Sequence, residues 1–241
     1  MNEKINNFDE TPFKEFLQDT RLSPDILEIK SRPDKFIRRW RVADENKEVL
    51  HSEIKSYRRG MKMFERLYEE YGINIPEQEL IIGKGSKNKT SIFTVIDRIE
   101  GESLDKIYDV SKEEQEKIEN FYCGLAQFYI DIYQNGGDFW WDFGNRQVVL
   151  GHKAGENENK VYIVDVEPRY YSYEPNNPRT GNPLLYAIHD VYTEAASLEK
   201  RINPPAHFKK LREKYGEISK IIPRDQMPAG FFKEIQETRP A

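Results

Sequence analysis

The sequence predicts an α+β fold whose strands are concentrated in the first hundred residues and whose long helices follow. Short apolar runs with alternating polar residues, typical of strands, fall mostly before residue 100. Apolar residues spaced by three and four dominate afterwards and indicate amphipathic helices. Two late apolar runs, at 148–150 and 161–164, flank a polar connection and add one β-hairpin to the helical part.

The composition indicates a globular chain with a very polar surface. Hydrophobic residues make up 37% and aromatic residues 12%, enough for a packed core, although the mean hydropathy is only -0.82. The net charge of -5, without a long basic stripe, argues against a dedicated nucleic-acid binder. The N-terminus is polar and no apolar run reaches membrane-spanning length, so we expect a cytoplasmic protein without a membrane span. The single cysteine, Cys123, excludes an intramolecular disulfide.

We expect three segments: a polar arm at residues 1–24, a sheet-rich part at 25–100 and a helical part at 101–241. Within the sheet-rich part, four strands are expected, at residues 25–30, 35–42, 80–83 and 91–99. A helix from about residue 49 to 71 falls between the second and third strands, because its apolar residues form one stripe that ends at Gly72.

Charged residues crowd the second expected strand and the helix after it. Arg38, Arg39 and Arg41 are more cations than a strand needs. Glu53 lies on the apolar face of the following helix, where a carboxylate is the expected partner of one of these arginines, with Glu65 as the second choice.

The helical part is organised around two long helices and the loop between them. Ser111 and Glu114 form a capping box that opens a helix to about residue 135. A second long helix begins near Pro183 and carries Asp190. After Pro205 we expect one or two polar helices.

The loop before the hairpin and the end of the hairpin's second strand carry acids and amides. The loop contains Asp138, Asp142, Asn145 and Gln147, and Asp165 directly follows the second strand. Pairing of the two strands brings the loop and Asp165 to the same end of a small ribbon. Carboxylate and amide oxygens are ligands that Mg²⁺ prefers, so the sequence predicts a metal–phosphate site there.

These motifs, in this order, resemble the protein-kinase-like superfamily, and in particular compact bacterial proteins of the aminoglycoside-phosphotransferase and lipopolysaccharide-kinase type. The resemblance covers about residues 25–200. It implies a bilobal fold with a small antiparallel-sheet N-lobe, a hinge at residues 97–101 and a short, mostly helical C-lobe that carries the catalytic and metal-binding loops. It also implies ATP and Mg²⁺ as cofactors.

On the C-lobe side, the resemblance implies that Asp142 accepts the proton of the acceptor hydroxyl, with Asp138 as the alternative base. Asp165, together with Asn145 or Gln147, would hold Mg²⁺. Asp190 would brace the catalytic loop from the central helix.

On the N-lobe side, the resemblance implies that Arg39, paired with Glu53, binds the phosphates in place of the usual lysine. Arg38 and Lys35 remain alternatives for this role. The main chain of Asp97 and Ile99 would hydrogen-bond the adenine edge.

Departures from the family pattern keep a second function open. No glycine precedes Gly60, so a glycine-rich phosphate loop is absent, and neither Asp138 nor Asp142 follows a His-x pair. We therefore predict an ATP- and Mg²⁺-dependent phosphotransferase acting on a hydroxyl of an unidentified acceptor, with a catalytically inactive pseudokinase that serves as a binding or scaffolding module as the alternative. A modified kinase that transfers another nucleotide moiety, or an unrelated α+β hydrolase, is a further possibility.

Overall fold

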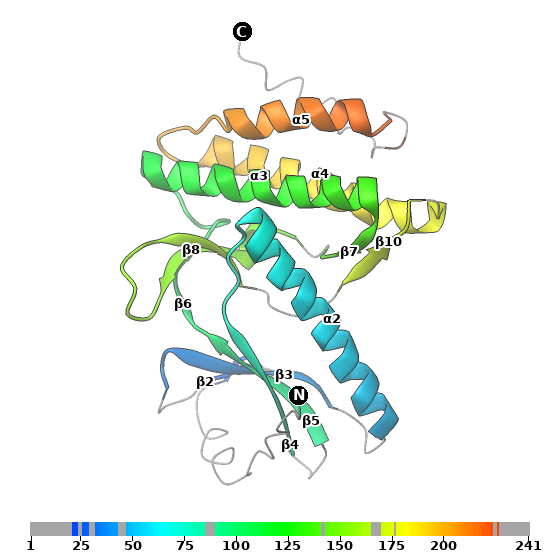
Figure 1. Ribbon diagram of the computed structural model, residues 1–241. Helices are drawn as coiled ribbons and strands as arrows, with labels where there is room; N and C mark the ends of the chain where they lie inside the picture. Colours follow the sequence, from blue (N-terminus) through cyan, green and yellow to red (C-terminus); the bar gives the residue numbers. More distant parts are fainter. Residues whose placement is uncertain are drawn as a thin grey trace. The chain divides into compact units, whose positions relative to one another are not determined.

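A computed structural model describes residues 21–23, 26–28, 32–42, 47–84, 90–140, 143–164, 170–175, 177–223 and 226 (Figure 1). The chain divides into two compact units. Unit 1 comprises Met1–Arg59, Pro76–Glu100 and His152–Glu158, and unit 2 comprises Gly60–Ile75, Gly101–Gly151 and Asn159–Ala241.

Unit 1 is built on a five-stranded antiparallel sheet. Its strands are β1 (Arg21–Ser23), β2 (Ile26–Glu28), β3 (Lys35–Val42), β4 (Gln78–Lys84) and β5 (Thr90–Asp97), in the spatial order β1-β2-β3-β5-β4. Helix α2 (Lys47–Tyr71) stands in the sequence between β3 and β4, and its residues up to Arg59 belong to this unit. The chain therefore leaves the sheet after β3 and re-enters it at the edge beyond β5.

The core of unit 1 comes from the two central strands. Ile37 on β3 is buried opposite Val95 of β5, and Ile92 and Ile96 are fully buried. Tyr57 ties α2 to the sheet, because its buried side chain donates a hydrogen bond from the hydroxyl to Gln78 Oε1 on β4 (3.3 Å). Large aliphatic residues on these two neighbouring strands thus account for the central pairing.

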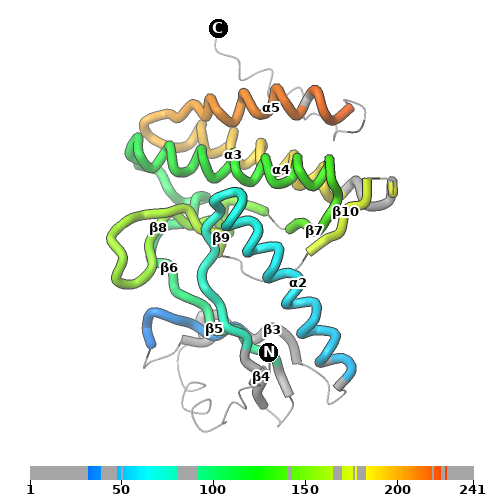
Figure 2. The backbone as a smooth tube through the Cα atoms, viewed as in Figure 1, coloured from blue at the N-terminus to red at the C-terminus, as the bar shows by residue number. Residues whose placement is uncertain are grey.

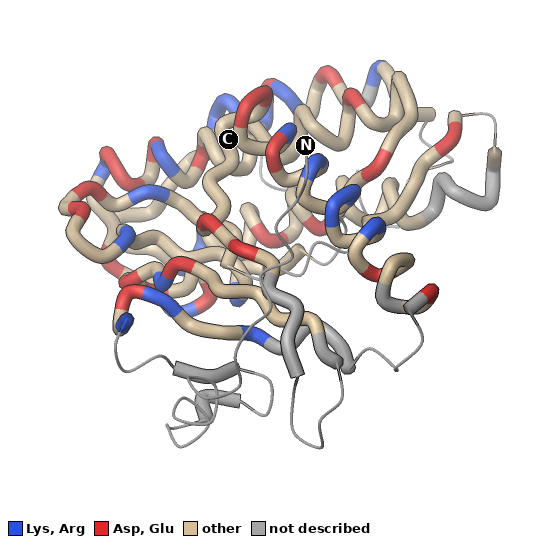
Figure 3. The backbone as a smooth tube through the Cα atoms, turned by 60° about the horizontal axis from the view of Figure 1, so that its bottom comes forward, with Lys and Arg blue, Asp and Glu red and all other residues tan. Residues whose placement is uncertain are grey.

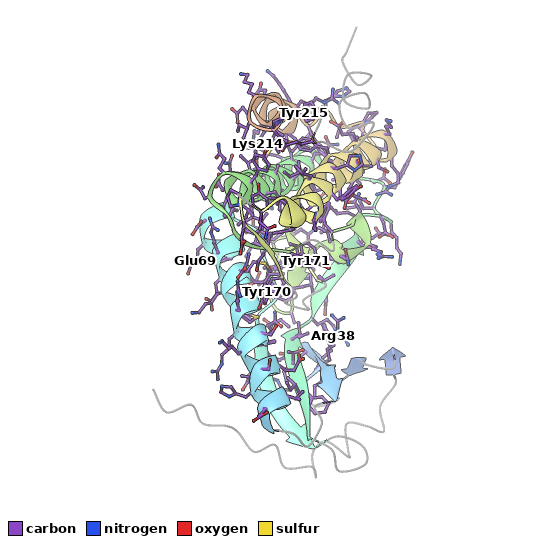
Figure 4. All side chains as sticks on the ribbon, turned by 90° about the vertical axis from the view of Figure 1, so that its right-hand side faces the viewer. Arg38, Glu69, Tyr170, Tyr171, Lys214 and Tyr215 are labelled. Carbon is purple, nitrogen blue, oxygen red and sulfur yellow. The ribbon has the colours of Figure 1, made fainter. Side chains whose placement is uncertain are left out.

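Unit 2 contains three long helices, α3 (Lys112–Asn135), α4 (Pro178–Arg201) and α5 (Lys209–Ile221). Helix α3 contacts both of the others, and the three lie side by side in Figure 1. On α5, Lys214 bonds Gln127 of α3, and the Tyr215 ring packs on Tyr192 of α4 at 5.1 Å between ring centroids; both α5 residues are labelled in Figure 4.

The remaining strands form two small sheets. The first has the order β6 (Ile99–Ser103), β8 (Val148–Lys153) and β9 (Lys160–Ile163), and Figure 2 traces β8 and β9 as one continuous hairpin. The second pairs β7 (Gly137–Phe139) with β10 (Tyr171–Tyr173) in antiparallel register. A short 3-10 turn, η2 (Asn145–Gln147), precedes β8.

The start of α3 is fixed by the predicted capping box. Ser111 Oγ accepts the main-chain N–H of Glu114 at 3.2 Å, and the Glu114 carboxylate accepts the Ser111 N–H at 3.0 Å. Asn159 in the hairpin connection also donates to Glu114 (3.0 Å). Burial alone raises the pKa of Glu114, but the hydrogen bonds from Asn159 and Ser111 outweigh burial and lower this pKa below its ordinary value.

Two glycines mark places where backbones approach closely within unit 2. A Cβ atom added to Gly124 on α3 would collide with the carbonyl oxygen of Tyr71, at the end of α2. A Cβ added to Gly101 would collide with the carbonyl oxygen of Leu150. Glycine at these two positions therefore permits α3 to pack on the end of α2, and β6 to pack on β8.

The predicted mixture of helices and small antiparallel sheets is confirmed. The helices expected at 49–71 and 111–135 and the hairpin at 148–164 lie within two residues of the observed bounds, whereas β7 and β10 were not expected. The observed units divide the chain differently from the expected segments: residues 60–75 cluster with unit 2, and the hairpin tip at 152–158 clusters with unit 1. Among the described helices, none has the length and apolar character that crossing a membrane requires.

Candidate functional site

The loop between β7 and β8 carries most of the predicted catalytic and metal-binding residues. The structure describes it up to Trp140 and again from Phe143. The predicted base Asp142 and the predicted metal ligand Asp165 lie outside the described residues. The described parts of the loop nevertheless show how the segment around Asp142 is held.

Both residues that border the undescribed pair are buried. Trp140 is 2% exposed, and its carbonyl oxygen accepts a hydrogen bond from the Tyr129 hydroxyl of α3 at 2.6 Å. The Phe143 ring is also buried and packs against Trp140 and Tyr122, with ring centroids 6.2 and 6.1 Å away. Asp142 is therefore flanked in sequence by aromatic side chains that belong to the core of unit 2.

Asn145 lies in the interior of unit 2, with a side chain that is only 3% exposed. Its Oδ1 accepts the Tyr122 hydroxyl at 2.5 Å, and its Nδ2 donates to the carbonyl oxygen of Glu194 on α4 at 3.0 Å. The Asn145 main-chain N–H donates to the Glu194 carboxylate at 3.3 Å. This geometry does not favour the predicted role of Asn145 as a metal ligand, because the amide is used to join the loop to α3 and α4.

Gln147, the other predicted amide ligand, lies where the loop meets the hairpin. Its N–H donates to the Gly144 carbonyl at 2.9 Å and closes the η2 turn, while its own carbonyl accepts the N–H of Val164 at 2.8 Å. Val164 immediately precedes Asp165. The structure therefore brings Gln147 next to the residue that precedes the predicted metal-binding acid.

Glu194 of α4 bonds the described part of this loop, whereas the bracing predicted for Asp190 stays a prediction, because the residues around Asp142 lie outside the described part of the chain. The Asp190 carboxylate lies 3.6 Å from Nδ1 of its neighbour His189. The burial of Tyr129 raises the pKa of that tyrosine, and the charge of Asp190 raises it further. Glu194 lies one helical turn further along α4 and bonds the loop directly. The spacing of four residues on one helix face is a signal that could have included Glu194 among the candidates.

Asp138, the alternative base, lies on the β7–β10 ribbon. Its carboxylate accepts the Ser172 hydroxyl at 2.7 Å, across the register pair that these two residues form. Tyr170 and Tyr171, labelled in Figure 4, are where the described chain resumes after the segment that contains Asp165. Ser172, the residue that bonds Asp138, follows them directly.

In unit 1, the predicted phosphate-binding residues lie on β3. The side chain of Arg39 lies outside the described residues, so its predicted pairing with the half-buried Glu53 stays a prediction. Arg38, labelled in Figure 4, is half-buried, and its carbonyl accepts the Thr94 hydroxyl at 3.4 Å. The fallback partner Glu65 is exposed.

The predicted adenine-binding strand ends in a cluster of four charges. The Asp97 carboxylate bonds Lys35 Nζ at 2.5 Å and Lys153 Nζ at 3.2 Å, and Lys153 also bonds Glu77 at 2.8 Å. Burial by itself lowers the pKa of the Lys153 ammonium, but its hydrogen bonds to Glu77 and Asp97 outweigh burial and raise that pKa above its ordinary value. Lys153, near the hairpin tip, was not among the predicted site residues.

The main chain at this end of β5 is partly used by the sheet. The Asp97 N–H donates to the Glu77 carbonyl at 3.0 Å, and the Arg98 N–H donates to the Asp34 carbonyl at 2.7 Å. The Asp97 N–H thus belongs to the sheet, whereas the adenine contact predicted at this residue concerns its carbonyl group and stays a prediction.

The described residues provide no ready-made metal site by themselves, since no group of three or more His, Cys, Asp or Glu side chains among them could hold a metal ion. Nor do charges of one sign dominate the described helices and strands, because basic and acidic positions are interspersed along them (Figure 3). In comparisons with known proteins, no protein-family model matches the chain, and no curated protein matches it.

Proposed function

We propose that this protein is an ATP- and Mg²⁺-dependent phosphotransferase of the kinase-like type. The observation that carries the proposal is the anchored loop around Asp142, which follows a long helix and leads into a short hairpin whose second strand ends two residues before Asp165 in the sequence. An antiparallel sheet with a long helix inserted between its third and fourth strands supports the same proposal. This order of elements matches the order that the motifs imply.

The chemistry of the proposal is positioning and charge neutralisation. Asp142 would take the proton of the acceptor hydroxyl while that oxygen bonds to the γ-phosphorus of ATP and the bond to the departing ADP breaks. Mg²⁺ would neutralise the charge of the phosphate oxygens. Asp165 and Gln147, rather than Asp165 and Asn145, would hold this metal ion. Gln147 is preferred because its main-chain carbonyl already accepts the N–H of Val164, the residue before Asp165. The side-chain amide of Asn145, by contrast, bonds α3 and α4.

Nucleotide binding would fall to unit 1. Arg39, supported by Glu53, would bind the phosphates, and the Asp97 carbonyl and the Ile99 N–H would bind adenine. Lys35 is the weaker alternative for the phosphates, since its ammonium already bonds Asp97. Arg38 remains open.

A pseudokinase, which binds nucleotide or a partner without turnover, is the second candidate. It is favoured by the interior position of Asn145, which removes one of the two amides that could complete a magnesium site. The absence of glycine before Gly60 favours it as well. The two functions differ in turnover and not in fold.

A thermal-shift titration with ATP, with and without Mg²⁺, tests the proposal. If the site is real, saturating nucleotide should stabilise the chain by about 3 kcal/mol, the mass-action value at about 100 times Kd, and only when Mg²⁺ is present. Asp165→Ala should abolish the metal-dependent shift, while the matched control Asp105→Ala, at an exposed turn of unit 2, should keep it. No shift in the parent would contradict the phosphotransferase and would leave only a pseudokinase that binds a partner without nucleotide, and a shift without ATP turnover would leave only a pseudokinase that binds nucleotide.

A further inference from the structure

Two buried tyrosines of α3 hold the loop that carries Asp142. Tyr122 and Tyr129 are seven residues apart, two helical turns, and therefore lie on the same face of the helix. Both side chains are fully buried. The Tyr129 hydroxyl donates to the carbonyl of Trp140, and the Tyr122 hydroxyl donates to the side-chain oxygen of Asn145.

The two acceptors flank Asp142 in the sequence. Trp140 lies two residues before it and Asn145 three residues after it. Connecting loops usually run over the surface, where water satisfies their polar groups. This loop instead turns polar groups into the core, where each requires a protein partner, and α3 supplies a hydroxyl on each side of Asp142.

The chemistry of the tyrosines suits a permanent donor. Burial, with the nearby Glu194 charge, raises the pKa of Tyr122 well above its ordinary value, and burial raises the pKa of Tyr129 in the same direction. Both hydroxyls therefore keep their protons at any physiological pH. On α4, the Glu194 carboxylate accepts the Asn145 N–H and makes a third anchor.

We propose that Tyr122 and Tyr129 are positioning residues whose hydroxyls fix the two ends of the Asp142 loop. The anchoring of the loop stands on the contacts alone, whereas its benefit to catalysis rests on the proposed function. Neither tyrosine was among the residues that the sequence indicated, because a tyrosine in an apolar helical stripe has the pattern of core packing.

Removing the hydroxyl groups of the two tyrosines distinguishes the effect of their hydrogen bonds to the loop from the effect of their rings on core packing. Tyr122→Phe and Tyr129→Phe keep the rings and lose only the hydrogen bonds. Tyr133→Phe is the matched control, since Tyr133 lies on the same helix and its hydroxyl bonds Gln226 instead of the loop (2.9 Å). Glu194→Gln removes the negative charge at the third anchor and serves as a second variant should either phenylalanine variant fold poorly.

Amide hydrogen exchange on the full chain gives a readout that does not depend on activity. In the Tyr122 and Tyr129 variants, the amides of Asn145 and Gln147 should exchange about fivefold to tenfold faster, the effect of one lost hydrogen bond, while the amides of α5 stay as in the parent. Tyr133→Phe should leave the loop amides unchanged. Loop exchange equal to that of the control in both variants would overturn the anchoring role.

ATP turnover measured on the same samples tests the positioning role. Tyr122→Phe and Tyr129→Phe should lower kcat about tenfold at an unchanged KM for ATP, whereas Tyr133→Phe should not. Faster loop exchange without a change in kcat would overturn the positioning role. If the parent shows no ATP turnover but the two variants still show faster loop exchange, the result would contradict the phosphotransferase proposal and leave the anchoring role in place.

Discussion

Replacing Asn145 with alanine distinguishes a structural amide from a metal ligand. The Asn145 amide links Tyr122 of α3 to the main chain of α4 in the interior of unit 2. Asn145→Ala leaves the fully buried Tyr122 hydroxyl without its acceptor, which costs about 1–3 kcal/mol, and deprives the Glu194 carbonyl of a donor, which costs about 1 kcal/mol more. The expected loss in the free energy of unfolding is therefore about 2–4 kcal/mol, with no metal or nucleotide present.

Urea denaturation followed by circular dichroism measures this loss. The control is Asn157→Ala, which truncates an exposed asparagine of the hairpin connection and should change the stability by less than about 0.5 kcal/mol. An Asn145→Ala protein as stable as this control, but deficient in Mg²⁺-dependent ATP binding, would refute the bracing role and restore Asn145 as a metal ligand.

Three further predictions concern other parts of the chain. The pKa of Glu114 is lowered on folding, so its contribution to stability is present above the unfolded pKa and is lost as the pH falls through the folded pKa; acid titration of unfolding should show a smaller loss in Glu114→Gln. Gly124→Ala should lower the melting temperature because the new methyl group meets backbone, whereas Gly216→Ala, with open space around it on α5, should stabilise by about 0.5–1 kcal/mol; equal effects would contradict the packing account. Neutralising Arg39 and Glu53 together should weaken ATP binding by less than the sum of the single changes, and strictly additive losses would point to Arg38 or Lys35.

Features with a local cause could be read from the sequence. The start of α3 follows from the reciprocal bonds of Ser111 and Glu114, two residues within a four-residue segment that needs no distant partner for this motif. The long helix α2 and the β8–β9 hairpin follow from apolar periodicity and from the polar connection between two apolar runs. Each of these signals lies within one continuous stretch of the chain.

Features that depend on distant parts of the chain could not be read in this way. The direction of the Asn145 side chain is decided by a hydroxyl 23 residues earlier and by a carbonyl 49 residues later. Lys153 reaches Glu77 across 76 residues of sequence, and no local pattern around a lysine in a hairpin indicates that contact. Glu194 was not among the residues that the sequence indicated, because only its tertiary contact with Asn145 distinguishes it from the other acids of α4.

The most direct test of the central claim is the rate of ATP turnover by the parent and by Asp142→Asn. The asparagine keeps the shape of the side chain and loses the charge that would take the acceptor's proton. We predict that the parent hydrolyses ATP slowly in the presence of Mg²⁺, that Asp142→Asn lowers this rate by a factor of about 10²–10⁴, and that the affinity for ATP stays nearly unchanged. A variant that hydrolyses ATP as fast as the parent would contradict the assignment of Asp142, and a parent that binds ATP without any turnover would contradict the phosphotransferase itself.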